Sequence, residues 1–193
     1  MNTIYVRTLS AIQAGMLMLS IVSFSIPTAA LADPVNDSNF HPPVVTAPSC
    51  TIVSDTADQV DGHGAVPVSP IHPYWTASIP DATWVWSENP LEPASATDGV
   101  SKTFTKTYTI TGQAADADLQ IAADNTYNVM IDGLPLASDP SGDNFSSADS
   151  IHIIHTPFLT PGTHTISFTV DNAPVAGSDG LSNPAGLLYK LTL

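Results

Sequence analysis

From Cys50 onward, apolar and polar residues alternate with a period of two, and clusters of Gly, Pro, Asp and Asn break the pattern at short intervals. The clearest run is 102–111, where Phe104, Tyr108 and Ile110 fall on one face and threonines fill the other. Successive side chains of a β-strand point to opposite faces, and threonine suits a half-solvated face. No stretch after Ala32 keeps the 3.6-residue period of an amphipathic helix. We therefore predict an all-β domain over 50–193.

The same alternation predicts several further strands, at 118–123, 126–131, 150–156, 164–170 and 187–193. Asp124-Asn125 can turn the chain between two of them, and Asp132-Gly133 is a hairpin signal. Eight or so short strands separated by turns are typical of an antiparallel β-sandwich of the jelly-roll kind.

The first 32 residues have the features of a secretory signal peptide in the usual order. Met1–Arg7 carries a positive charge, 8–26 is almost entirely apolar or small, and Ala30-Leu31-Ala32 fits a cleavage site. A membrane anchor is the alternative, but Gln13 and Gly15 interrupt the run and no stop-transfer charges follow it. We expect cleavage after Ala32 and a secreted or cell-surface protein without a further membrane span. A flexible proline-rich leader is expected at 33–49.

Charge excludes several classes of partner. The expected mature chain has three lysines, no arginine and 18 acidic residues, a formal net charge of −15. Nucleic acids and anionic membranes need a basic surface, so neither is an expected partner. The chain is nevertheless 43% hydrophobic and only 11% charged, which argues against a disordered acidic tail.

Cys50 is the only cysteine, so an internal disulfide is excluded. Such a residue is either a buried small hydrophobe or an intermolecular link. The strand-like run Cys50–Val53 favours burial.

All three tryptophans lie in two aromatic segments, Tyr74-Trp75 and Trp84-Val85-Trp86. Tryptophan can grip the apolar face of a sugar ring at an exposed site, or seal the end of a core. We expect Trp84 and Trp86 to belong to the core. Tyr74 and Trp75 follow a His-Pro pair in a loop, and Trp75 is the better candidate for exposure.

Carboxylate and amide side chains gather in several of the expected loops. They include Asp124 with Asn125, and Asp139 with Asp143 and Asn144. Calcium takes six to eight oxygen ligands and tolerates irregular loops, whereas solvated turns use the same residue types. The calcium ligands stay unknown at this stage. Further pairs of this kind are Asp58 and Asp61, Asp116 and Asp118, and Asp171 and Asn172.

Catalytic motifs do not stand out. The six histidines lack zinc-finger spacing, and no nucleophile elbow or metalloprotease motif occurs. His152 and His155 would point to opposite faces of a strand. Glu88 and Glu92 are the only glutamates, and nothing beyond their presence points to a glycosidase carboxylate pair. We therefore predict no enzymatic activity and no catalytic residues.

Three segments carry a family resemblance: 82–86 with Trp-x-Trp, 104–108, and Ala123–Gly133 within 117–133. The last reads Ala-Asp-Asn-x-Tyr-x-Val-x-x-Asp-Gly and resembles the hairpin of galactose-binding-like jelly rolls, where Asn usually precedes the glycine. The closing 183–189 is similar to the end of such domains. The resemblance implies a relative of the sugar-binding accessory domains of glycosidases and of stand-alone bacterial surface proteins. It also implies a structural calcium ion whose ligands it does not map.

The leading hypothesis is a secreted or cell-surface, lectin-like module for carbohydrate binding or cell adhesion, with a glycan or surface partner. Its site would be formed by loops at one end of the sandwich. The candidate ligand-binding residues are Tyr74, Trp75, Asp124, Asn125, Asp143 and Asn144. The alternative is a structural subunit that self-assembles into an extracellular structure or surface layer, through the leader, Cys50 and exposed sheet edges.

Overall fold

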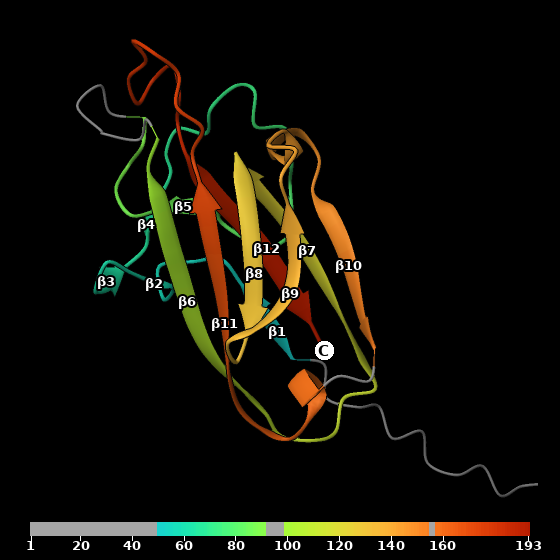
Figure 1. Ribbon diagram of the computed structural model, residues 1–193. Helices are drawn as coiled ribbons and strands as arrows, with labels where there is room; N and C mark the ends of the chain where they lie inside the picture. Colours follow the sequence, from blue (N-terminus) through green and yellow to red (C-terminus); the bar gives the residue numbers. More distant parts are fainter. Residues whose placement is uncertain (1–49, 92–98, 155–156) are drawn as a thin grey trace, which may run out of the picture. The chain divides into compact units, whose positions relative to one another are not determined.

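The computed structural model describes residues 50–91, 99–154 and 157–193, which lie in a compact unit spanning Val44–Leu193. The expected signal peptide and leader, together with Glu92 and His155, lie outside the described residues. Within that unit, strands form two antiparallel sheets in two layers (Figure 1). The predicted β-sandwich is confirmed.

One layer, named here the β12 sheet, has the strand order β10-β7-β12-β5-β4, and β1 also pairs with β12. β7 and β12 pair over seven residues, from Gly186 opposite Asp124 to Thr192 opposite Asp118. Gly186 lies under Trp75, where a Cβ would come within 2.6 Å of the indole. The strands are β1 (Thr51–Val53), β4 (Val66–Pro67), β5 (Val85–Trp86), β7 (Asp116–Asp124), β10 (Asp149–Ile154) and β12 (Gly186–Thr192).

The other layer, the β11 sheet, has the order β3-β2-β6-β11-β8-β9. β6 and β11 pair along their whole length of ten residues, which makes this ladder the longest in either sheet. The strands are β2 (Gln59–Val60), β3 (His63–Gly64), β6 (Ser101–Ile110), β8 (Thr126–Ile131), β9 (Leu134–Asp139) and β11 (Gly162–Asp171). Two 3-10 helices, η1 (Asn144–Ser146) and η2 (Pro157–Leu159), lie in connecting segments.

Aromatic side chains join the two layers in the core. Phe168 of β11 stacks on Tyr189 of β12 with ring centroids 4.1 Å apart, and Trp86 of β5 packs on Phe104 of β6 at 5.4 Å. All four are fully or almost fully buried. Each such burial stabilises the fold by about 1.5–3 kcal/mol. The prediction that Trp84 and Trp86 are core residues is confirmed.

A buried ionic cluster sits between the layers. The ammonium of Lys106 on β6 lies 2.7 Å from Asp55 and 3.4 Å from Asp58, whose side chain is fully buried. The hydroxyl of Tyr189 donates to Asp58 at 2.6 Å. Burial raises the pKa of Asp58 despite these partners. Asp58, which the sequence left open as a solvated turn residue or a calcium ligand, is therefore a buried residue of the core.

The predicted strands occur within a few residues of their expected bounds, and the Asp132-Gly133 hairpin is confirmed with positive φ at both residues. Asp124-Asn125 does not make a hairpin: it carries the chain from β7 in one sheet to β8 in the other. Cys50 is half-buried and is a free thiol. None of the helices among the described residues has the length and apolar content needed to span a membrane.

Candidate functional site

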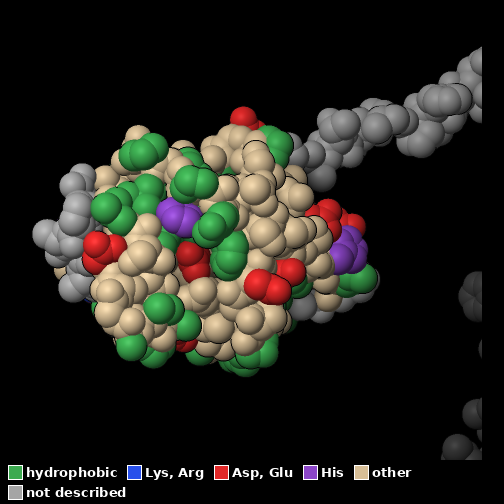
Figure 2. Space-filling model, turned by 90° about the horizontal axis from the view of Figure 1, so that it is seen from above, with side chains coloured by type: hydrophobic (Ala, Val, Ile, Leu, Met, Phe, Trp, Pro, Cys, Tyr) green, Lys and Arg blue, Asp and Glu red, His purple; other side chains and the backbone are tan. Residues whose placement is uncertain are grey.

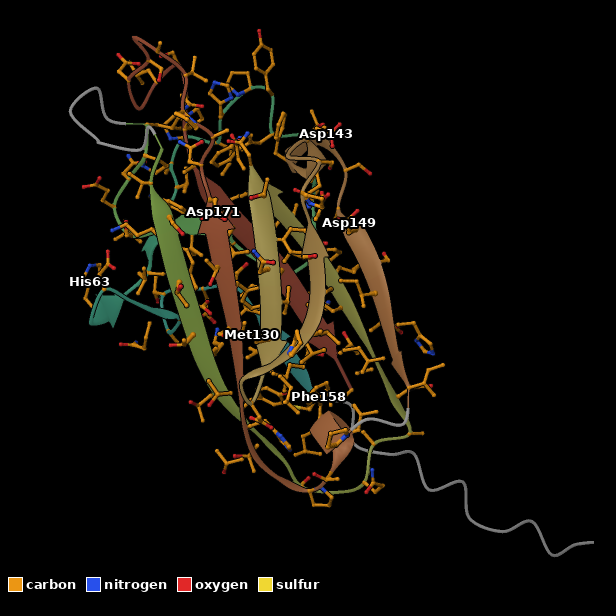
Figure 3. All side chains as sticks on the ribbon, viewed as in Figure 1. His63, Met130, Asp143, Asp149, Phe158 and Asp171 are labelled. Carbon is orange, nitrogen blue, oxygen red and sulfur yellow. The ribbon has the colours of Figure 1, made fainter. Side chains whose placement is uncertain are left out.

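Loops from distant parts of the sequence meet at one end of the sandwich. They are the β4–β5 connection (68–84), the β7–β8 turn, the β9–β10 connection with η1 (140–148), and the β11–β12 connection (172–185). Figure 3 shows Asp143, Asp149 and Asp171 at this end, which we name the loop end, and Phe158 at the opposite one. Most of the polar residues that were predicted for a loop site therefore lie at or near this end.

Asn125 holds three of these loops together. Its backbone N–H donates to the carbonyl of Asp171 at 3.2 Å, and its side-chain amide donates to the carbonyl of Gly142 at 3.3 Å. Its amide oxygen accepts the N–H of Ala173 at 2.6 Å. Gly142 has φ 78°, and a Cβ there would lie 3.3 Å from the Cβ of Asn125. Asn125 is therefore a positioning residue for the β9–β10 and β11–β12 loops.

Asp124 ties the β4–β5 loop to the same turn. It is 6% exposed, and its Oδ2 accepts the indole N–H of Trp75 at 2.7 Å. Burial raises the pKa of this carboxyl to about 6, although the hydrogen bonds from Trp75 and Asn125 oppose the shift. The carboxylate is held inside the fold and does not face the solvent.

Trp75 itself is 5% exposed, so the expectation that it is exposed is wrong. Its ring stacks on Trp84 with centroids 4.5 Å apart. The close approach of Gly186, which has no side chain, leaves room for the indole. Trp75 is therefore a buried residue that anchors the β4–β5 connection to the core.

Tyr74, which directly precedes Trp75 in the chain, is 75% exposed. The ring of His72 lies edge-on to it, with centroids 5.3 Å apart. Other exposed apolar side chains of the loop end are Ile71, from the β4–β5 connection, and Val175 and Leu181, from the β11–β12 connection. Figure 2 looks down on this part of the protein and shows hydrophobic side chains gathered around a histidine, with acidic side chains beside them. An exposed aromatic ring in such a setting is the kind of surface on which a sugar ring stacks.

A polar cavity of about 410 Å³ adjoins this loop. Thr76 donates its hydroxyl to the carbonyl of Ser146 at 2.9 Å, and Ala77 donates its N–H to the carbonyl of Phe145 at 3.0 Å. These contacts join the segment after Tyr74 to the cavity wall. The lining residues are serines, aspartates and an asparagine, namely Ser138, Asp139, Ser141, Asp143, Asn144, Ser146, Ser147 and Asp149.

Asn144 builds the floor of that cavity. It is 5% exposed, its amide oxygen accepts the N–H of Ala123 at 2.9 Å, and its amide nitrogen donates to Asp149 at 3.2 Å. The hydroxyl of Tyr127 donates to the same Asp149 oxygen at 2.7 Å. Burial and the neighbouring carboxylate raise the pKa of Tyr127, so its hydroxyl stays protonated and keeps donating.

The six predicted residues thus divide into two groups. Tyr74 and Asp143 are exposed, where a ligand can reach them, whereas Trp75, Asp124 and Asn144 are buried and Asn125 is half-buried behind them. Sequence reasoning did not single out Asp149 or Ser141. The serine-rich composition of 138–150 is a signal that could have indicated them.

The predicted calcium site has no ready-made group of side-chain ligands in the part of the chain that the structure describes. The amide oxygens of Asn125 and Asn144 and Oδ2 of Asp124 already accept N–H donors. Across the described ranges, no three His, Cys, Asp or Glu side chains come together as metal ligands. Calcium takes six to eight oxygen ligands, and the structural calcium ion that the resemblance implied stays a prediction. Glu88 is exposed beyond β5 and its suggested partner Glu92 is not described.

Comparisons with known proteins found similar glycosidases and carbohydrate-binding modules. The chain is 28% identical over 117 residues to an α-L-rhamnosidase of Streptomyces avermitilis, which covers 60% of this chain and 11% of the rhamnosidase. The crystal structure of that enzyme complexed with L-rhamnose matches 56% of this chain and 10% of its own, at 26% identity and a TM-score of 0.44. This chain therefore spans about a tenth of its curated relative. No family model matches it.

Two carbohydrate-binding modules are similar over nearly their whole lengths. The family 35 module from Clostridium thermocellum has 12% identity and a TM-score of 0.40, covering 74% of this chain and 97% of the module. A family 36 module in complex with calcium and xylotriose has 12% identity and a TM-score of 0.35, covering 75% and 98%. The chain is similar to these modules and to domains of glycosidases, and its own two antiparallel sheets form the β-sandwich that the resemblance to galactose-binding-like jelly rolls implied.

Proposed function

We propose that this protein is an exported, non-catalytic carbohydrate-binding module whose site is the loop end. The observation that carries the proposal is Tyr74, 75% exposed and joined through Thr76 and Ser146 to a polar cavity of about 410 Å³. Sugar sites combine an aromatic surface for the apolar face of the ring with a few polar groups for its hydroxyls. Both parts occur at the loop end, on segments that the hydrogen bond from Thr76 to Ser146 joins.

The buried residues behind this surface support the proposal. Trp75, Asp124 and Asn125 fix the positions of three loops through side-chain hydrogen bonds. A site whose loops are already held in place loses less conformational freedom when it binds. The signal-peptide pattern of Met1–Ala32 supports the proposed export. An exported protein that binds glycans could in turn adhere to a glycan-coated surface.

The test is a glycan panel titrated into the purified chain by calorimetry, beginning with α-L-rhamnosides because the curated relative is an α-L-rhamnosidase. Tyr74→Ala should weaken binding of the sugar that responds by roughly tenfold or more, since an anchoring aromatic ring is lost. Tyr74→Trp should keep binding, because it keeps the stacking surface.

Ile154→Ala is the matched control. Ile154 is also an exposed hydrophobic residue, 53% exposed, but it lies at the end of β10. Its truncation should leave binding unchanged. If Tyr74→Ala binds as well as the unchanged chain, Tyr74 is not the platform and the proposal fails.

The structural subunit is the second candidate, and one observation favours it. β9 and β10 each end a sheet, with a partner strand on one side only among the described residues. Such an edge can add a strand from another copy. β9 carries Pro135 and an irregular register at Val129/Met130, both of which hinder that pairing, so β10 is the edge to consider. A monomer by light scattering at high concentration, with and without reductant, would remove this candidate.

A further inference from the structure

The polar cavity at the loop end has more hydrogen-bond acceptors than donors. Ser141 Oγ lies 2.8 Å from Asp139 Oδ2 and 2.9 Å from Asp143 Oδ1. A hydroxyl carries one proton, so Ser141 donates to one of these carboxylates at a time. The other carboxylate can accept from a donor that enters the cavity.

Among the residues that the structure describes, no lysine or arginine compensates these carboxylates. The cavity lining contains only Ser, Asp and Asn, with Asp139, Asp143 and Asp149 among them. The three lysines of the described residues have partners elsewhere: Lys102 pairs with Asp61, Lys106 with Asp55 and Asp58, and Lys190 with Asp81. Whatever binds here meets negative charge and unused acceptor oxygens together.

From this arrangement we infer that the glycans bound at the loop end are uncharged, and that sugars bearing a carboxylate or a sulfate are excluded. Sugar hydroxyls supply the donors that the aspartates lack, whereas an anionic group brings only acceptors and a like charge. Repulsion between like charges grows as the site loses water, so stacking on Tyr74 makes the exclusion stronger. This inference rests on the proposed function, and it adds the class of ligand.

The test compares sugars that differ only in the acidic group. Methyl galactoside and methyl galacturonide, then methyl glucoside and methyl glucuronide, are titrated into the full chain in the presence of a chelator. The neutral member of each pair should bind roughly tenfold or more tightly than its uronide. The difference should shrink between about 0.02 M and about 0.5 M salt, because salt screens exposed charges.

Two variants assign the effect to the cavity. Asp143→Asn removes one lining carboxylate from an exposed loop position and should raise the affinity for the uronide. Asp116→Asn removes the same charge from an exposed position at the start of β7, outside the cavity, and should change neither affinity. Thermal unfolding of both variants checks that they fold.

The outcomes distinguish a failure of the inferred charge selectivity from a failure of the proposed carbohydrate binding. A uronide that binds as tightly as its neutral partner would overturn the inference and leave carbohydrate binding standing. An equal change in Asp143→Asn and Asp116→Asn would show that the cavity does not select by charge. Absence of binding by any sugar, neutral or acidic, would overturn both.

Discussion

Asp124 is a carboxylate held away from water, with the indole N–H of Trp75 as its donor at 2.7 Å. Burial raises its pKa in the folded protein to about 6, above the value of about 3.9 for an unfolded chain. The folded state therefore binds more protons between these two pKa values. It follows that the free energy of unfolding falls as the pH rises through this window.

Asp124→Asn should remove this dependence, because an amide oxygen still accepts the indole N–H but carries no charge. We expect the variant to gain stability over the unchanged chain as the pH rises from about 4 to about 6, by up to about 3 kcal/mol. Urea unfolding at several pH values measures the difference. Asp116→Asn, at an exposed position, is the control and should not show the same gain. A constant difference between the Asp124 variant and the unchanged chain would contradict the account.

Lys106 on β6 shows how a strand carries a charge into the interior. Its side chain is 13% exposed and its ammonium faces Asp55 and the fully buried Asp58. It also donates to the carbonyl of Val53 on β1, a strand of the other sheet. The element therefore links the two layers through a polar contact as well as through its apolar face.

Lys106→Met should destabilise the fold by about 3–5 kcal/mol, because it leaves the carboxylate of Asp58 buried without a cation. Lys102→Met is the matched control on the same strand. Its partner Asp61 is 47% exposed, so loss of that pair should cost less than about 1 kcal/mol. Chemical unfolding of both variants gives the comparison. Similar losses for both would mean that the buried cluster does not stabilise the fold as described.

Strand periodicity predicted most of the long elements because each has enough residues to show it, but it did not predict the six-residue β9, whose run Leu134–Asp139 contains Pro135 and lacks a clear alternation. β6, β7, β8, β10, β11 and β12 all occur where the alternation places them. The two-residue strands β2, β3, β4 and β5 are too short to have a period, so pattern alone could not predict them. The sheet to which a strand belongs depends on pairing between segments that are distant in sequence. The sequence therefore predicted a turn at Asp124-Asn125 but not that this turn connects the two sheets.

The sequence predicted which loops contribute to the candidate site, but it did not predict which of their side chains are buried. Turn chemistry indicated the loops with Asp124, Asn125, Asp143 and Asn144, and the structure brings these loops to one end. Burial could not be predicted: Trp75 packs close to Gly186, and Asp124, 49 residues later in the chain, accepts its N–H. Such long-range contacts have no local signal in the sequence.

At the scale of the whole molecule, the large negative net charge affects which partners can approach. The sequence has a formal net charge of −14, and each lysine that the structure describes forms an ion pair. Net charge of this size favours solubility and repels anionic partners at long range. The uncharged ligands inferred for the loop end are consistent with the field of the entire protein.

The central claim is that a glycan binds at the loop end, and amide and indole NMR shifts during a titration test it most directly. The account predicts that Tyr74, Thr76 and Ser146 shift with saturation, together with the indole N–H of Trp75, which lies directly beneath them. The indole of Trp86, buried against Phe104 between the sheets, should not shift. Shifts confined to the strands of either sheet, with the loop end unchanged, would contradict the account.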